Sequence, residues 1–294
     1  MKLIDRAHMD VGKWDELVAR SKASVFSTSA YLDAVSKKWL ILVDDDYSKG
    51  IALPYTDRLG IKMIYTPVFL RYLEFVNGEF GKSELNLIQA SFPIGEIQIQ
   101  SIDQNVSAEK KQFQLITSTA QFQLNEQARR MIRKFEKSNL HWQETTDNGK
   151  IIALIEDELS AKVKSLNKSM IELRKLTQNL TEKGYLRSFL VRSEEHILGG
   201  IFFVEFNGRV LYLKSAFKVE AKKAGAMYAI LNRTIQNALE RDMIFDFGGS
   251  NVEDVRRFNL HFRANDVDYY AVSWGKIPRW FQLIKRLRQL FKRS

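Results

Sequence analysis

The clearest pattern of hydrophobic and polar positions lies in residues 218–250. A basic turn containing glycine precedes a long helical pattern, and a short apolar run at 243–247 then ends in Gly248 and Gly249. Apolar residues at helical spacing give this helix one face that can be buried against a sheet. These residues are Met227, Ile230, Leu231, Ile235 and Leu239. The segment therefore predicts a helix and a strand that pack together in an α/β sheet.

Similar patterns on both sides of this unit predict the same order of elements twice. In the first half they predict helices at 14–21, 28–38, 82–90 and 125–137, and strands at 40–43, 51–55, 62–66, 96–102 and 112–117. In the second half they predict helices at 167–183 and 252–262, and strands at 186–191, 199–206, 210–216 and 268–273. Asn207 and Gly208 are typical of a hairpin turn. We expect an α/β (α+β) fold of two domains, 1–147 and 148–294, with mixed, mainly antiparallel sheets.

Composition and charge narrow the function. The chain has 294 residues and no cysteine, which excludes disulfides, thiolate metal sites and a cysteine nucleophile. Its four histidines are scattered through the sequence, so we expect no metal site. The net charge is +10, which favours a polyanionic partner such as nucleic acid, anionic lipid or a phosphorylated substrate.

The two ends of the sequence bear on location. The first ten residues are charged and lack the apolar core of a signal peptide, and no apolar run approaches the ~20 residues that span a bilayer. We therefore expect a cytoplasmic protein. Residues 279–294 predict a basic amphipathic helix. Such a helix fits two arrangements equally well: contact with the inner face of the membrane, or docking on the protein body.

A candidate site for an anion lies at the start of the long helix. Lys222 and Lys223 precede Gly225, and the first backbone N–H groups of a helix attract phosphate. The strand end at Gly248 and Gly249 is a second candidate, because ligands in α/β folds usually bind at strand ends. An ordinary helix–strand unit without a ligand explains the same spacing equally well.

Several segments resemble known acyltransferases. The turn VEAKKAGAM is similar to the pyrophosphate loop of GNAT acyltransferases, with Lys222 in its first position, Gly225 as its first glycine and Met227 in place of its second small residue. The segment FDFGGSNVEDVRRFNLHFRANDVDYYAV resembles tandem GNAT proteins of the Fem group, which are peptidoglycan bridge-forming aminoacyltransferases. Arg263 stands where that group has glycine. Segments 26–35, 52–69 and 112–140 resemble the first half of the same proteins.

The resemblance implies two tandem GNAT-like domains and the transfer of an acyl or aminoacyl group to an amine. The acceptor would be a small molecule or a lipid-linked precursor of the cell envelope, and no cofactor would be tightly bound. The donor stays open between an acyl-CoA, an acyl carrier protein and an aminoacyl-tRNA.

Each candidate site residue has a functional and a structural interpretation. Asp246 would act as the base, or would instead cap the turn that follows it. Tyr212 and Tyr228 would donate protons to the leaving group, or would only pack in the core. The remaining candidates are Lys222, Lys223, Gly225 and Ala226 as the donor cradle and Ser250, Arg256 and Arg257 as substrate-binding residues.

A second class of function is a binding protein without catalytic activity, built on a GNAT-like scaffold. Its ligand would be a polyanion, either nucleic acid or anionic lipid. The basic helix pattern at 127–137, QARRMIRKFEK, supports this alternative.

Overall fold

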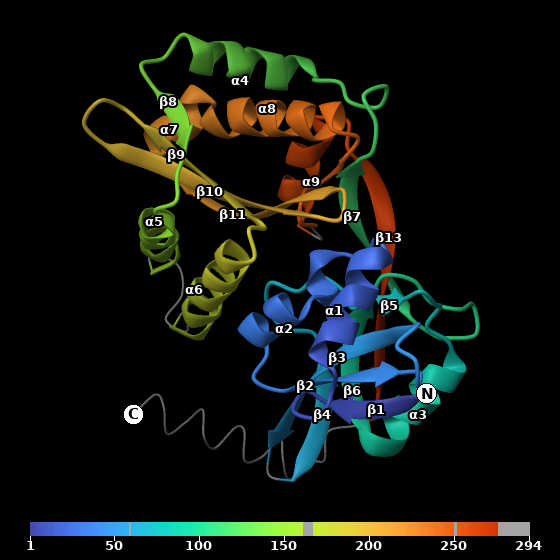
Figure 1. Cartoon of the computed structure of the whole chain (residues 1–294). Helices are drawn as coiled ribbons and strands as arrows, with labels where there is room; N and C mark the ends of the chain where they lie inside the picture. Colours follow the sequence, from blue (N-terminus) through green and yellow to red (C-terminus); the bar gives the residue numbers. More distant parts are fainter. Residues whose placement is uncertain (59, 161–166, 250–251, 276–294) are drawn as a thin grey trace.

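The structure, a computed structural model, describes residues 1–58, 60–160, 167–249 and 252–275 (Figure 1). The first half of the chain forms three helices, one short 3-10 helix and seven strands within the described residues. Their bounds are β1 (Lys2–Asp5), α1 (Val11–Arg20), η1 (Val25–Ser27), α2 (Ser29–Val35), β2 (Trp39–Val43), β3 (Gly50–Arg58), β4 (Ile61–Tyr65), β5 (Phe75–Val76), α3 (Lys82–Ser91), β6 (Ile94–Ile99) and β7 (Glu109–Ile116).

The remaining described elements follow the first half along the chain. Their bounds are α4 (Glu126–Glu136), β8 (His141–Glu144), α5 (Asn148–Ser160), α6 (Asn167–Glu182), β9 (Leu186–Arg192), β10 (Ile197–Phe206), β11 (Arg209–Phe217), α7 (Val219–Ala224), α8 (Ala226–Glu240), β12 (Ile244–Asp246), α9 (Glu253–Leu260) and β13 (Asn265–Trp274).

One continuous path of strand pairing runs through both halves. Its order is β1-β2-β3-β4-β6-β13-β7-β12-β11-β10-β9-β8, and β5 pairs with β3 at the side. Among the described strands, the pairs β4–β6 and β11–β12 are parallel and the others are antiparallel. The predicted mixed, mainly antiparallel architecture is therefore confirmed.

Helices cover both faces of the C-terminal part of the sheet (Figure 1). Helices α4 and α8 lie together on one face, and α5 and α6 lie on the other. The apolar face of α8 packs against β10, β11 and β12 in one core cluster. A second cluster lies between α5, α6 and the opposite face of the sheet, and the largest cluster lies in the N-terminal part.

Long apolar runs explain why the central strands are buried. The segment WLILV of β2 is buried at every position. Seven successive positions of β10, from Leu198 to Val204, are buried as well. Runs of this kind are typical of strands that are covered on both faces. The hairpin predicted at Asn207 and Gly208 is confirmed, because both residues lie between β10 and β11 and have positive φ.

The two halves of the chain share strands. β13 lies between β6 and β7, with Tyr270 opposite Ile99 and Asn265 opposite Leu115. β7 also pairs with β12. Before the predicted boundary at residues 147 and 148, α4 already packs on α8 and β8 pairs with β9. The boundary stays a prediction.

Some elements differ from the sequence patterns. Residues 219–224, expected in a turn, form the short helix α7. The patterns do not predict β1, β5, β8 or α5, of which the three strands have only two to four residues each. The predicted helix at 279–294 lies outside the described residues. Within the described ranges, every helix is too short or too polar to span a bilayer.

Candidate active site

Strands β11 and β12 separate at the centre of the molecule. Their parallel pairing ends at Leu211 and Asp246. β12 stops there, while β11 continues to Phe217. Gly248 and Gly249 then turn the chain with φ of 79° and 84°, which glycine adopts without strain. Because ligands in α/β sheets bind beyond the carboxyl ends of strands, this opening is the first candidate for a site.

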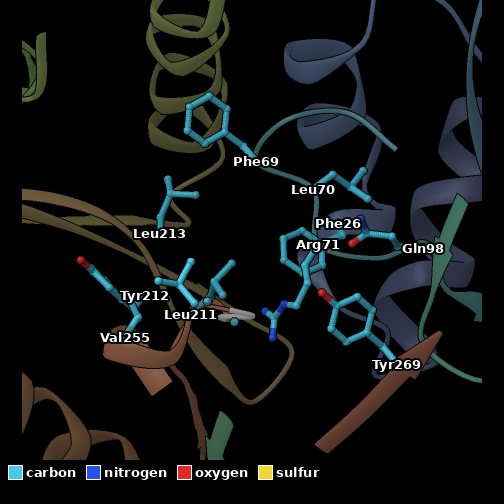
Figure 2. Close-up of a pocket in the computed structure, with 13 residues that line it drawn as sticks. Phe26, Phe69, Leu70, Arg71, Gln98, Leu211, Tyr212, Leu213, Val255 and Tyr269 are labelled. Atoms are coloured by element: carbon cyan, nitrogen blue, oxygen red, sulfur yellow. The ribbon is translucent and has the colours of Figure 1, made fainter. Parts of the chain in front are cut away.

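A cavity of about 550 Å³ lies at this opening. Figure 2 shows Leu211 and Leu213 of β11 and Val255 of α9 on one side of it, and Arg71 and Tyr269 on the other. The cavity therefore lies between elements of the N-terminal and C-terminal halves. Both halves contribute to its wall.

Asp246 binds two arginine side chains beside this cavity. The Nη1 and Nη2 groups of Arg71 donate to the two carboxylate oxygens at 2.9 and 2.8 Å. Arg209 donates to Oδ2 at 3.0 Å, and the backbone N–H of Gly248 donates to Oδ1 at 2.9 Å. Asp246 is fully buried and the Arg71 side chain is 5% exposed. Charges buried this deeply persist only when they are paired and hydrogen-bonded.

The contacts of Asp246 determine its ionisation. Burial raises the pKa of this carboxyl, but the charges of Arg71 and Arg209 outweigh burial and hold the pKa below its usual range. An ionised carboxylate with a low pKa is a weak base, and here both oxygens already accept hydrogen bonds. The contact with Gly248 agrees with the structural interpretation, in which Asp246 caps the turn. A role as the catalytic base stays a prediction.

Aromatic rings enclose the Arg71 guanidinium. Its Cζ atom lies 4.2 Å from the ring centre of Phe113, 5.1 Å from that of Tyr72 and 5.4 Å from that of Phe26. Tyr72 accepts a hydrogen bond from Arg209 at 2.9 Å, and burial raises the pKa of its hydroxyl. Arg71 and Arg209 carry two positive charges against the one negative charge of Asp246, so these three groups keep a net positive charge beside the cavity, in a surrounding with little water where electrostatic interactions are strong.

The two predicted tyrosines lie in different places. Tyr212 lines the cavity, and its hydroxyl is 2.6 Å from that of Ser215. Tyr228 begins α8 and does not line the cavity; its hydroxyl is 2.9 Å from Nδ1 of His261, and its ring packs on Phe258. Burial raises the pKa of both tyrosine hydroxyls. Their roles as proton donors stay predictions.

Part of the predicted donor cradle packs closely against α4. Gly225 lies between α7 and α8 with φ of 90°. A Cβ atom at this position would lie 2.2 Å from the carbonyl oxygen of Met131 in α4. The glycine thus allows the backbone of α4 to approach the start of α8, and Ala226 next to it is fully buried.

The two lysines of the same segment lie at the surface. Lys222 forms an ion pair with Glu158 of α5 at 2.8 Å. Lys223 is exposed. The position of Lys222 at the end of α7 also places it near the C-terminal, negative end of that short helix. Donor binding by Lys222, Lys223, Gly225 and Ala226 stays a prediction.

The predicted substrate-binding residues are separated in the structure. Arg256 is bonded to Asp266 of β13, which also accepts a hydrogen bond from Gln114 at 2.9 Å. This network joins α9, β13 and β7. Arg257 is exposed and lies 3.7 Å from the carboxylate of an aspartate on its own helix. Ser250 lies outside the described residues. The binding roles of these three residues stay predictions.

The sequence patterns do not predict the roles of Arg71 and Arg209. Arg71 is the one cation in the largely apolar run PVFLRYLEFV at 67–76, which also contains Glu74, and a cation in such a run needs a partner if it is buried. This signal identifies Arg71 as unusual. It does not identify Asp246, which lies 175 positions further along the chain.

Comparisons with known proteins agree with this fold. Residues 123–255 match the family model described as an acetyltransferase (GNAT) domain, and this range begins just before α4. The fold is similar to that of FemX, with a TM-score of 0.62 and 10% identity over 92% of this chain and 97% of FemX. L-PGS from Bacillus licheniformis has a TM-score of 0.59 and 12% identity over 95% of this chain and 96% of that protein.

A third similar structure is a tandem GNAT protein from the clavulanic acid biosynthesis pathway. Its TM-score is 0.50, with 10% identity over 94% of this chain and 99% of that protein. The comparison with curated protein sequences gives no match. The chain therefore has a fold like that of Fem-type tandem GNAT proteins, as the sequence resemblance implied, and its residues 123–255 match the GNAT-domain model.

Proposed function

We propose that the protein transfers an acyl or aminoacyl group to an amine, in the cavity where β11 and β12 separate. The observation that carries this proposal is the position of the cavity. It lies at the carboxyl end of β12 within a GNAT-like fold, and its wall includes Arg71, which is paired with the buried Asp246. An amine on a precursor of the cell envelope or on a similar glycan is the acceptor.

The reaction proceeds by direct attack. The amine nitrogen bonds to the carbonyl carbon of the donor, and the resulting oxyanion then collapses as the bond to the carrier oxygen or sulfur breaks. The carrier leaves with the proton that the amine loses. The excess positive charge of Arg71 and Arg209 over Asp246 stabilises the negative charge that develops on the carbonyl oxygen. The aromatic rings around Arg71 strengthen this effect, because they exclude water.

The contacts of residues 222–226 support an aminoacyl-tRNA donor over acyl-CoA. The carbonyl of Met131 occupies the space beside Gly225, and Glu158 neutralises Lys222. To bind the pyrophosphate of an acyl-CoA at the start of α8, the protein would need the space beside Gly225 to be open and Lys222 to be unpaired. A tRNA carrier needs only its aminoacyl end in the cavity, because its phosphates can contact the protein elsewhere.

The second candidate function is binding without catalysis. The described residues that line the cavity include no Asp, Glu or His. A proton from the attacking amine must therefore leave through water or through the carrier. If neither path operates, the same cavity would only hold a ligand.

A transfer assay tests the proposal. The protein is incubated with radiolabelled aminoacyl-tRNA or acyl-CoA and with a cell-envelope precursor extract as acceptor, and label on the acceptor is measured. We expect transfer from aminoacyl-tRNA. If the protein does not increase the label on the acceptor with either donor, the binding function is favoured.

Two matched variants locate the reaction. Val255 lines the cavity and is 41% exposed, so Val255→Trp should fill part of the cavity at little cost to folding. We expect at least a tenfold loss of transfer. Leu87→Trp introduces the same ring at a 44% exposed position on α3 and should leave transfer unchanged. Equal activity of both variants would move the reaction away from this cavity.

A further inference from the structure

Helix α4 and its C-cap residue expose five basic side chains that form no ion pair within the described residues, together with the carboxylates of Glu126 and Glu136 at the two ends of the helix. Its exposed basic residues are Arg129, Arg130, Arg133, Lys134 and Lys137. None of the five forms an ion pair within the described residues, and the described contact among them is a hydrogen bond from Arg130 to Gln127 at 2.7 Å. By contrast, Lys168 and Arg174 of α6, on the other face of the sheet, are both paired with glutamates.

The geometry of the helix gathers these charges on one side. At about 100° per residue, the five positions fall within an arc of roughly 140°. The opposite side of α4 carries Ala128 and Phe135, which are buried against α8. Figure 1 shows α4 on the outside of α8, so the basic row faces away from the protein. Arg129 and Lys137, the first and last of these cations, are separated by about 12 Å along the helix axis.

The surroundings of this row indicate what it binds. The exposed large hydrophobic residues of the described chain include none on α4, and its Met131 and Ile132 are half-buried, so the helix offers little apolar surface to a lipid interface. It also has no exposed aromatic ring on which single-stranded bases could stack. A row of cations without either feature fits the regular phosphates of a double helix.

We propose that the exposed row of α4 binds the phosphate backbone of double-helical RNA. The choice of RNA over DNA rests on the proposed function, in which an aminoacyl-tRNA is the donor. The row is about 12 Å long, which is enough to contact more than one phosphate of a strand. Arg129, Arg133 and Lys137 recur every four residues and form the line that follows this strand.

Direct binding tests this surface without any turnover. The full-length protein is titrated with fluorescent unacylated tRNA, with a short RNA duplex, with a DNA duplex of the same sequence, and with vesicles of phosphatidylglycerol. If five cations contact phosphate, affinity for RNA should fall about 500-fold between 50 and 200 mM salt. We expect tighter binding to the two RNA probes than to DNA or vesicles. Equal or tighter binding to DNA or to vesicles would overturn the assignment to RNA.

A triple variant assigns the effect to α4. The triple variant combines Arg129→Gln, Arg133→Gln and Lys137→Gln. Its affinity for RNA should fall only about tenfold between 50 and 200 mM salt. The control changes Lys13→Gln, Lys168→Gln and Lys183→Gln remove the same charge from exposed positions elsewhere and should bind as the wild type does. Equal loss in both triple variants would show that only net charge matters, and would refute the proposal.

The cavity variant separates this proposal from the proposed function. Val255→Trp should lose transfer and keep its affinity for RNA, whereas the α4 variant should raise the KM for aminoacyl-tRNA and keep kcat. If the protein binds RNA through α4 but transfers no acyl group, the proposed RNA-binding surface is supported and only the proposed transferase activity is refuted.

Discussion

Replacing Asp246 with asparagine removes the charge that holds Arg71 and Arg209 in the core. The carboxylate accepts hydrogen bonds from both guanidinium groups, and it is fully buried. Breaking a buried ion pair by removing one partner costs about 3–5 kcal/mol, because the remaining charge is left without compensation. For a chain of this size the corresponding fall in Tm is on the order of 10 °C.

Urea unfolding followed by circular dichroism at neutral pH measures this loss. Asp254→Asn is the control, because it removes a carboxylate that is 87% exposed and 3.7 Å from Arg257. Exposed pairs of this kind contribute about 0–1 kcal/mol. A destabilisation by Asp246→Asn that does not exceed the control would refute the view that this carboxylate holds the two arginines in place.

The pH dependence gives a second test of the same pair. The pKa of Asp246 is lowered in the folded protein, below the ordinary value of about 3.9 for an unfolded chain. Its contribution to the free energy of unfolding is therefore complete above about pH 4 and is lost as pH falls through the lower, folded-state pKa. The stability difference between wild type and Asp246→Asn should be constant from about pH 8 to 5 and narrow below about pH 4. A difference that narrows near neutral pH would contradict this sign.

Two glycines give further predictions on stability. Gly225→Ala should lower the free energy of unfolding in urea by about 3 kcal/mol, because its Cβ meets the Met131 carbonyl and its φ is positive. Gly208→Ala has a similar φ but open space around the Cβ, so it should lower this free energy by only about 1–2 kcal/mol. Equal losses would mean that α4 does not approach Gly225 this closely. Gly95→Ala places a Cβ 2.1 Å from the ring of Trp274, so it should cost about 1–3 kcal/mol and change the near-UV circular dichroism of that tryptophan. An unchanged spectrum would argue against this contact between β6 and β13.

Local patterns predicted the elements whose causes lie close together in sequence. The apolar face of α8 and the turn at Asn207 and Gly208 depend on residues within a few positions of one another, and both are confirmed. Helix α7 was not predicted, since VEAKKA resembles a known loop and its helical form depends on contacts with α4, β10 and β11. The strand β8 has only four residues, which is too short for a clear pattern.

The candidate site was predicted only in part for the same reason. The end of β12 and the Gly-Gly turn follow from the local sequence, and Asp246 was identified there. Arg71 belongs to the other half of the chain and meets Asp246 only in the folded protein. The close approach of Met131 to Gly225 could not be predicted either, because these residues are 94 positions apart, beyond the reach of any local pattern.

The insertion of β13 between β6 and β7 has a consequence for the synthesis of the protein on the ribosome. β7 is complete once residue 116 has been made, but the strand that joins it to β6 ends only at residue 274. Because synthesis adds about 5–20 residues per second, β13 is complete only roughly 8–30 s after β7. During this time the inner edges of β6 and β7 carry unpaired backbone groups, which attract other extended chains. The nascent protein should therefore depend on chaperones until the last strand emerges.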